Sequence, residues 1–321
     1  MAERITALTT SQVKCFKKCR KRYELEYICN LKPIETPKAL AIGTLFHYGL
    51  ELLQGGLELH EVIRDVQIHC ETDAILRQVD VDYYDLYTAQ EMIVAWDKQS
   101  GWRNWNIVNV ELPFEVSTGY AKRLKGKMDG IILHPETGKP YLQEHKTTSM
   151  WGENYLHSLL WDEQPTNYLY AYEQLRKQGK IDLPPADGIF YDIIEKTTIK
   201  PFSATPIEKR KYTKEGKLYA GQHETDETPE AYALRVKEWY EAEQRVHTAF
   251  VYRTQEDIQA QIEDFNLTIK DIVHAEKEET FYRNPDCCKI LPCPYAPKCL
   301  DNVPDTDCLF MKKAAKHEEL L

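Results

Sequence analysis

The stretch RLKGKMDGIILHPETGKPYLQEHKTT, residues 123–148, decides the fold of this chain. Apolar residues surround Asp129 and lead into Glu144, which predicts two β-strands. The turn-forming residues 134–140 between them predict that the two strands are adjacent and antiparallel. Because side chains alternate along a strand, Glu144 and Lys146 are expected on one face, with His145 pointing away.

The predicted strands carry Asp129, Glu144 and Lys146 toward one end of the sheet. Two carboxylates with a nearby ammonium group can hold Mg²⁺ and activate a water molecule against a phosphodiester. The alternative is a solvated ion pair between Glu144 and Lys146, which is common on exposed strands and contributes little stability. Three further features favour the catalytic interpretation.

Two flanking helices supply the first two of these features. The stretch GTLFHYGLE, residues 43–51, opens a predicted helix in which His47 and Glu51 share one face. Gln164 and Tyr168 have the same spacing early in an amphipathic helix after the second strand. Each pair alone is more often a matter of packing or solvation. The third feature is their order: a helix with histidine, a strand with Asp, a strand with Glu-x-Lys, and a helix with Gln and Tyr.

These four motifs resemble the RecB-type branch of the PD-(D/E)XK nuclease superfamily, which includes the RecB and AddB nuclease domains and CRISPR-adaptation exonucleases. The resemblance extends from about residue 8 to residue 300, and Glu144 stands where many members have Asp. It implies an α/β fold with a PD-(D/E)XK restriction-endonuclease-like core. In that core a central mixed β-sheet is flanked by helices, and N-terminal helices and an iron–sulfur cluster segment are added.

The resemblance also implies a function and residue roles. The protein would be a metal-dependent deoxyribonuclease, expected to be an exonuclease, that acts in recombination, repair or phage- or CRISPR-type processing. Its expected partner is DNA that is single-stranded or has single-stranded ends. Mg²⁺ or Mn²⁺ would be held by a histidine, two carboxylates and a backbone carbonyl: His47, Asp129, Glu144 and His145. Lys146 would orient or deprotonate the attacking water, or stabilise developing charge. Gln164 and Tyr168 would position the DNA backbone or the lysine.

The chain has nine cysteines, five of them within residues 287–308. The N-terminus lacks the apolar segment of a signal peptide, so a disulfide framework is not expected. The expected location is the cytoplasm, for a protein encoded by a bacterium or by a phage. Prolines and short spacings predict that the cysteine-rich segment folds around a metal ion or an iron–sulfur cluster. Buried structural thiols are the alternative.

Nucleases of the AddB kind hold a [4Fe-4S] cluster with one N-terminal and three C-terminal cysteines. The stretch CRKRYELEY, residues 19–27, resembles the upstream part of that motif. The resemblance therefore implies four cluster ligands: Cys19, Cys288, Cys293 and Cys299. Four residues separate the first two C-terminal ligands where the family has two, so Cys287 could replace Cys288 and the role of Cys308 stays open. Zinc bound by the same sulfurs is the chemical rival.

The net charge of −10 argues against a protein that passively coats DNA. Positive charge is nevertheless local, and the candidate phosphate contacts are Lys18, Arg20, Lys21, Arg22, Lys125 and Lys127. A solvated basic surface is the alternative for both groups. The chain has no apolar run long enough for a membrane span and no P-loop, so unwinding of DNA would need a helicase or recombination partner.

Three regions are expected: an N-terminal helical region at 1–100 that contributes Cys19 and His47, a nuclease core at 101–282 with a protruding insertion near 196–227, and a cysteine segment with a charged tail at 283–321. Helices are predicted at 9–28, 42–55, 58–78, 82–99, 154–178, 229–246 and 255–276. Strands are predicted at 106–116, 122–134, 140–148, 188–194 and 248–253.

Two other classes of protein remain open. The first is a catalytically inactive nuclease fold that serves as a DNA-binding scaffold, against which the intact Asp129, Glu144 and Lys146 argue. The second is a zinc-stabilised interaction protein. Absorbance at about 400 nm separates it from the iron–sulfur alternative, because zinc thiolate sites are colourless there.

Overall fold

A computed structural model describes residues 6–34, 38–290, 293–300 and 309–313. Its centre is a six-stranded mixed sheet in the order β1-β4-β5-β6-β7, with β3 also paired to β4. The strands are β1 (Ala7–Leu8), β3 (Asn106–Val116), β4 (Arg123–Leu133), β5 (Pro140–Thr148), β6 (Gly188–Glu195) and β7 (Val246–Val251). The β4–β5 pair is antiparallel and the β5–β6 pair is parallel, so the predicted mixed sheet is confirmed.

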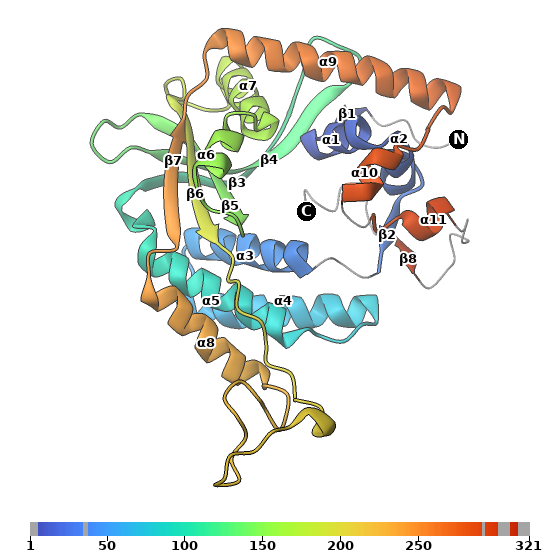
Figure 1. Cartoon of the computed structure of the whole chain (residues 1–321). Coiled ribbons are helices and arrows are strands. Elements are labelled where there is room, and N and C mark those ends of the chain that lie inside the picture. Colours follow the sequence, from blue (N-terminus) through green and yellow to red (C-terminus); the bar gives the residue numbers. More distant parts are fainter. Residues whose placement is uncertain (1–5, 35–37, 291–292, 301–308, 314–321) are drawn as a thin grey trace.

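Helices cover both sides of the sheet (Figure 1). One side carries α3 (Lys38–Gln54), α4 (Leu59–Arg77), α5 (Tyr83–Gln99) and α8 (Pro229–Ala242), and the other carries α1 (Thr10–Lys18), α6 (Glu153–Leu159), α7 (Glu163–Lys177) and α9 (Gln255–Glu278). Each set of helices buries its own apolar cluster, one of them including Met128 and Ile193, the other Ile194 and Val246. The fold is therefore a layered α/β arrangement whose strands are held from both faces.

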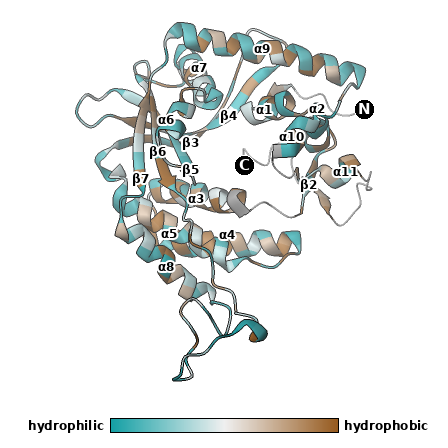
Figure 2. Ribbon diagram, in the orientation of Figure 1, coloured by the Kyte–Doolittle hydropathy of each residue, from teal (hydrophilic) through white to brown (hydrophobic). Residues whose placement is uncertain are grey.

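Strand β6 lies between β5 and β7 and is buried along nearly its whole length. Its sequence, GIFYDIIE, is a nearly continuous apolar run, as expected for a strand covered on both faces. In Figure 2 the central strands are coloured as hydrophobic, whereas the segment that hangs below α8 is mainly hydrophilic. The apolar content of β6 thus fixes the middle of the sheet next to β5.

The predicted helix at 9–28 is interrupted. Thr9 begins α1 with a capping box completed by Gln12. At Cys19 the backbone is extended (φ −160°, ψ 110°), and the chain then re-enters a short helix, α2 (Arg20–Tyr23), followed by a π-helical turn at Glu24–Ile28. The continuous helix was wrong because Cys19 leaves helical geometry, and the backbone nitrogen of Lys21 then donates to the carbonyl of Tyr282, outside the helix.

Three further predicted elements differ. The predicted helix at 154–178 is two helices, α6 and α7, because the Asp162 side chain accepts a hydrogen bond from the Gln164 backbone and starts a new helix. The predicted helix at 229–246 ends at Ala242, and β7 begins at Val246 rather than at residue 248.

The two ends of the described chain meet in a pairing that the sequence did not predict. Strand β2 (Leu31–Pro33) pairs antiparallel with β8 (Phe310–Lys312). The cysteine segment, expected to be a loop, contains two short helices, α10 (Pro285–Ile290) and α11 (Ala296–Leu300), which lie near α2 (Figure 1). The N-terminal helices and the C-terminal segment therefore form one corner of the molecule.

Candidate active site

The antiparallel pairing of β4 and β5 brings the two predicted carboxylates together. Asp129 Oδ2 accepts a hydrogen bond of 2.9 Å from the backbone nitrogen of His145. Glu144 is buried, and its Oε1 lies 2.6 Å from Lys146 Nζ. The side chain of His145 points to the opposite face of the sheet, where its ring lies 5.5 Å from that of Trp96. The predicted alternation along β5 is thus what the structure has.

Burial disfavours the charged forms of the two carboxylates. Burial raises the pKa of Asp129 to about 7, and it raises the pKa of Glu144 to about 7 as well, with Asp129 adding to the effect. Glu144 Oε2 is buried and has no hydrogen-bond donor among the residues that the structure describes. Two buried carboxylates, one of them with an oxygen that lacks a donor in the described part of the chain, suit a hard divalent cation, so this pair fits Mg²⁺ or Mn²⁺.

His47 reaches the same place from α3. Its Nδ1 lies 3.8 Å from Asp129 Oδ2, and 36% of its side chain is exposed. The loss of bulk water around the ring lowers the pKa of His47 to about 4, so the imidazole is neutral at pH 7 and can donate a lone pair to a metal.

The expected set of four metal ligands is not closed. In the part of the chain that the structure describes, no group of three or more His, Cys, Asp or Glu side chains is arranged to hold a metal ion. The reason is visible in the pairings: Lys146 already holds Glu144, and the Asp129 carboxylate is hydrogen-bonded to the backbone of β5. The ligands expected from the sequence are neighbours, but they do not form a finished site.

Lys146 is held in its charged form. Burial alone would lower its pKa, but the carboxylates of Glu144 and Asp162 raise the pKa of Lys146 well above its ordinary value. Asp162 Oδ2 lies 3.1 Å from Lys146 Nζ, and Asp162 Oδ1 lies 3.0 Å from Lys14 Nζ. The sequence reasoning missed Asp162, although an Asp followed by a helical segment is a recognisable N-cap. A charged lysine favours orienting water and stabilising charge over accepting a proton.

Gln164 and Tyr168 lie beside the carboxylates and contact each other. Gln164 Nε2 donates to the Tyr168 hydroxyl at 2.8 Å, and the buried Tyr168 ring packs against Phe114. A Cβ on Gly126 would lie 2.8 Å from Phe114 and 3.3 Å from Tyr168. The glycine three residues before Asp129 is therefore needed so that this aromatic pair can approach β4.

Glu111 is a site residue that the sequence did not reveal. It lies on β3 between the register pairs Val110–Gly130 and Leu112–Met128, across from Asp129, and its φ is +50°. This left-handed backbone is unusual within a strand and disfavoured for a residue with a side chain. Glu111 Oε2 lies 2.9 Å from Lys127 Nζ. Burial is the main cause of the raised pKa of Asp129, and the negative charge of Glu111 is the second. No periodicity in the sequence marks such a local change.

A chain of buried amides supports β5 from the other face. His145 Nε2 lies 3.2 Å from Gln54 Oε1, Gln54 donates to Gln143, and Gln143 donates to Asp192. Burial raises the pKa of Asp192 to about 7. These contacts tie β5 to α3 and β6, and so hold the strand that carries Glu144 and Lys146 in register.

Most of the predicted phosphate-binding residues are engaged within the protein. Arg20 lies 3.4 Å from Asp271, Arg22 lies 2.9 Å from Glu26, and Lys21 binds Glu24. Of the other candidates, Lys18 lies at the exposed end of α1 and Lys127 binds Glu111. Lys125, on β4, lies opposite Glu115 of β3. Ion pairs with the chain's own carboxylates leave these groups less charge for DNA than expected.

Cysteines from both ends of the chain lie close together. Cys19 is buried beside α2, and the sulfurs of Cys287 and Cys288 are 4.0 Å apart. Burial raises the pKa of Cys287 to about 11, with the thiols of Cys288 and Cys19 adding to the effect. Burial and neighbouring thiols also raise the pKa values of Cys293 and Cys299. Within the described ranges these thiols do not form a closed metal site, and Cys308 lies outside those ranges.

No helix in the described part of the chain has both the length and the apolar character to cross a membrane.

Comparison with known proteins agrees with the geometry. A search of curated proteins gave no match. The structure resembles the crystal structure of a protein from Eubacterium rectale described as “Putative exonuclease”, with a TM-score of 0.51 and 12% sequence identity over 98% of this chain and 92% of that one. At this identity the likeness concerns the fold. The sequence profile of the PD-(D/E)XK nuclease superfamily matches residues 7–300, and the chain belongs to that superfamily.

Proposed function

We propose that this nuclease is a Mg²⁺- or Mn²⁺-dependent deoxyribonuclease with exonuclease activity. The observation that carries the proposal is the buried pair Asp129 and Glu144, with one Glu144 oxygen lacking a donor among the described residues, beside a lysine held in its charged form. The description of the structurally similar protein from Eubacterium rectale supports the exonuclease activity.

The roles of the side chains follow from their chemistry. Asp129, Glu144 and neutral His47 would hold the metal, together with the backbone carbonyl of His145. The bound metal ion would lower the pKa of a water molecule and offset the charge that builds up on the phosphate. Lys146, anchored by Glu144 and Asp162, orients the attacking water and donates to a phosphate oxygen. These donors act in a partly buried site, where they are stronger than in water.

Gln164 and Tyr168 act as a positioning pair. Because Gln164 donates to the Tyr168 hydroxyl, that hydroxyl keeps its own proton available for another acceptor. Burial raises the pKa of Tyr168 well above its ordinary value, and the nearby carboxylates of Glu144 and Asp129 add to this. The phenol therefore stays protonated and can donate a hydrogen bond to the DNA backbone, but it is a poor nucleophile.

We also propose a [4Fe-4S] cluster held by Cys19, Cys288, Cys293 and Cys299, with Cys287 as the alternative to Cys288. The support is that Cys19, just before α2, and the thiols of the segment that contains α10 and α11 are close enough for Cys19 to help raise the pKa values of Cys287, Cys293 and Cys299. The cluster would fasten the two ends of the chain and take no part in the hydrolysis.

The nuclease function is tested with end-labelled single- and double-stranded DNA, incubated with Mg²⁺ or Mn²⁺ and resolved on a gel. We expect metal-dependent cleavage that releases short products from an end. Lys146→Ala should lower the rate by about a thousandfold, because a positioned charged donor is lost. Binding of both DNAs without cleavage by the metal-loaded wild type would instead favour the inactive scaffold.

Glu111 should tune the pH dependence of the reaction. Its negative charge helps to raise the pKa of Asp129, so Glu111→Gln should lower that pKa and keep Asp129 ionised at lower pH. We expect the acid limb of the pH–rate profile to move down by about half a pH unit, the size expected of one neighbouring charge. Glu115→Gln, a more exposed carboxylate on the same strand, is the matched control and should leave the profile in place. An unmoved acid limb in Glu111→Gln would show that Glu111 does not influence Asp129.

A further inference from the structure

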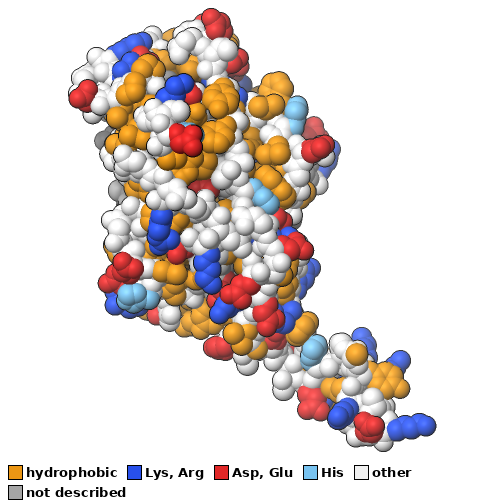
Figure 3. All heavy atoms as spheres, turned by 90° about the vertical axis from the view of Figure 1, so that its left-hand side faces the viewer, with side chains coloured by type: hydrophobic (Ala, Val, Ile, Leu, Met, Phe, Trp, Pro, Cys, Tyr) orange, Lys and Arg blue, Asp and Glu red, His pale blue; other side chains and the backbone are white. Residues whose placement is uncertain are grey.

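Residues 196–228, between β6 and α8, form a segment that we call the arm. It stands clear of the rest of the molecule below α8 (Figure 1), and the space-filling view shows lysine and arginine side chains around its end (Figure 3). Its tip, IEKRKYTKEGKLY at residues 207–219, has five basic and two acidic residues. The nuclease function proposed above does not use this segment.

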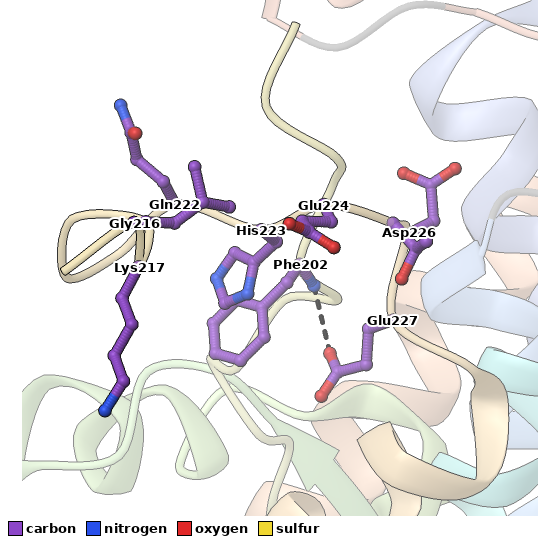
Figure 4. A pocket seen from close by; sticks show the side chains of 10 residues that line it. Phe202, Gly216, Lys217, Gln222, His223, Glu224, Asp226 and Glu227 are labelled. Carbon is purple, nitrogen blue, oxygen red and sulfur yellow. Dashed lines mark hydrogen bonds between the residues drawn. The ribbon is translucent and has the colours of Figure 1, made fainter. Parts of the chain in front are cut away.

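The base of the arm is fixed to α8. Both carboxylate oxygens of Glu227 accept hydrogen bonds from Arg235, at 2.7 and 2.6 Å, and the Arg235 guanidinium lies 3.7 Å from the centre of the Phe202 ring. Phe202 in turn stacks on His223, with ring centres 4.3 Å apart, and its backbone nitrogen donates to Glu227 (Figure 4). The arm is thus anchored where it leaves the body.

The two limbs of the arm are joined to each other. The Gln222 side chain accepts from the Lys211 backbone at 2.7 Å and donates to the Lys209 carbonyl at 3.0 Å. Arg210 donates to the carbonyls of Thr205 and Glu224. Fixing a segment of this length costs conformational entropy, which here is offset by polar contacts and not by an apolar core at the tip. The arm is therefore a structured projection.

The tip presents charge and aromatic surface without internal partners. Lys209, Lys211, Lys214 and Lys217 are exposed and form no ion pair with any residue that the structure describes. Tyr212 and Tyr219 are 51% and 50% exposed. The basic groups near the N-terminus differ, because Arg20, Lys21 and Arg22 are all bound to carboxylates.

We propose that the tip of the arm binds a single strand of DNA. Lysines that contact phosphates and tyrosines that stack on bases are the two elements of sequence-independent single-strand binding. A cavity of about 540 Å³ lies between tip and base, where Lys217 lines it together with Glu224, Asp226 and Glu227. Glu227 is paired with Arg235, but the carboxylates of Glu224 and Asp226 disfavour phosphate inside the cavity. The strand therefore lies along the exposed lysines of the tip, with Lys217 at the rim of the cavity, and away from these carboxylates. The inference deepens the proposed function, because the bound strand is the substrate of the nuclease site.

The first test measures charge. Binding of fluorescein-labelled dT20 is followed by anisotropy with the full chain in a Lys146→Ala background, so that the strand is not cut. Lys209→Ala/Lys211→Ala/Lys214→Ala/Lys217→Ala should weaken binding by about tenfold or more and reduce the salt slope by about 3. The control, Lys177→Ala/Lys180→Ala/Lys237→Ala/Lys277→Ala, has the same change in net charge at exposed positions outside the arm. It should stay within about twofold of the parent.

The second test measures stacking. Tyr212→Ala/Tyr219→Ala should weaken dT20 binding by about tenfold and leave the salt slope unchanged, because no phosphate contact is lost. Tyr212→Phe/Tyr219→Phe should restore binding, since the ring is kept. This pair also controls for folding, because the side chains are exposed and the Phe variant preserves their packing.

Several outcomes would overturn the arm proposal. Equal weakening by the two lysine variants would make the effect one of net charge alone. If the variant of the four tip lysines loses binding to vesicles of phosphatidylcholine and phosphatidylserine but binds dT20 as the parent does, the arm binds anionic lipid instead. Hydrolysis of bis(4-nitrophenyl) phosphate, with Lys146 present, tests the nuclease site separately. If the arm variants hydrolyse this ester at the wild-type rate while their dT20 binding falls, both proposals are supported. If the wild type hydrolyses neither the ester nor DNA, the nuclease proposal fails, and the dT20 measurements still decide whether the arm binds a single strand.

Discussion

Asp129→Asn should abolish metal-dependent cleavage and also stabilise the metal-free protein at pH 8. Activity should fall by about a thousandfold or more, because the amide cannot replace the negative charge that holds the metal. The gain in stability has a different cause. Ionised Asp129 lies beside Glu111 in a buried place, and the pKa of Asp129 is accordingly raised to about 7. Removing that charge should raise the free energy of unfolding by about 2 kcal/mol.

The sign can be checked through pH. A carboxyl whose pKa is higher in the folded than in the unfolded protein binds more protons when folded between about pH 4 and 7, so the stability of the metal-free wild type should rise as the pH falls through that range. The advantage of Asp129→Asn should therefore be largest above pH 7 and vanish near pH 4. Mn²⁺ should raise the melting temperature of the wild type at pH 8 but not that of Asp129→Asn, because only the carboxylate gains from the cation.

Asp192→Asn is the matched control. Asp192 is also buried with a pKa raised to about 7, but it lies on the other face of the sheet with His145 and Gln143. This variant should share the stability gain at pH 8 and keep both cleavage and the response to Mn²⁺. If Asp129→Asn cleaves DNA at the wild-type rate, or if Mn²⁺ stabilises it as it does the wild type, the assignment of Asp129 to the metal site is wrong.

Sequence patterns predicted the sheet well because its signals are local. Alternation around Glu144 and the apolar run of β6 each depend on a few neighbouring residues, and the structure has both strands where they were expected. The same alternation placed Glu144 and Lys146 on one face. Element existence followed from periodicity, whereas the ends of elements depended on side-chain caps such as Asp162.

What the sequence did not predict depends on contacts between distant segments. The left-handed backbone of Glu111 occurs where β3 passes Asp129 of β4, and nothing in NVELPF marks it. The anionic partner of Arg20 lies on α9, and that of Arg22 lies in the π-helical turn. The sequence shows the positive charges of the two arginines, but it does not show which carboxylates neutralise them. The pairing of β2 with β8 joins residues about 280 positions apart, a separation at which local patterns carry no information.

The other large effect is expected at Cys19. This buried thiol sits at the break between α1 and α2, and it contributes, after burial, to the raised pKa values of Cys287, Cys293 and Cys299. If these sulfurs hold a cluster, it closes a loop of about 270 residues, and cross-links over long loops remove much entropy from the unfolded chain. Cys19→Ser should therefore bleach the brown colour of the anaerobically purified protein and lower its melting temperature by about 10 °C.

Cys70→Ser is the control for this effect, because Cys70 is only partly buried, on α4, in a different apolar cluster. It should keep the colour and melt within about 2 °C of the wild type. Cleavage by Cys19→Ser should fall only as far as the fold loosens, since the cluster takes no part in the reaction, and its residual activity should keep the wild-type metal dependence. Iron analysis should give about four irons per chain for wild type and Cys70→Ser. A colourless wild type with one zinc would replace the cluster by a zinc site and leave the assignment of Asp129, Glu144 and Lys146 untouched, because the two sites share no side chain.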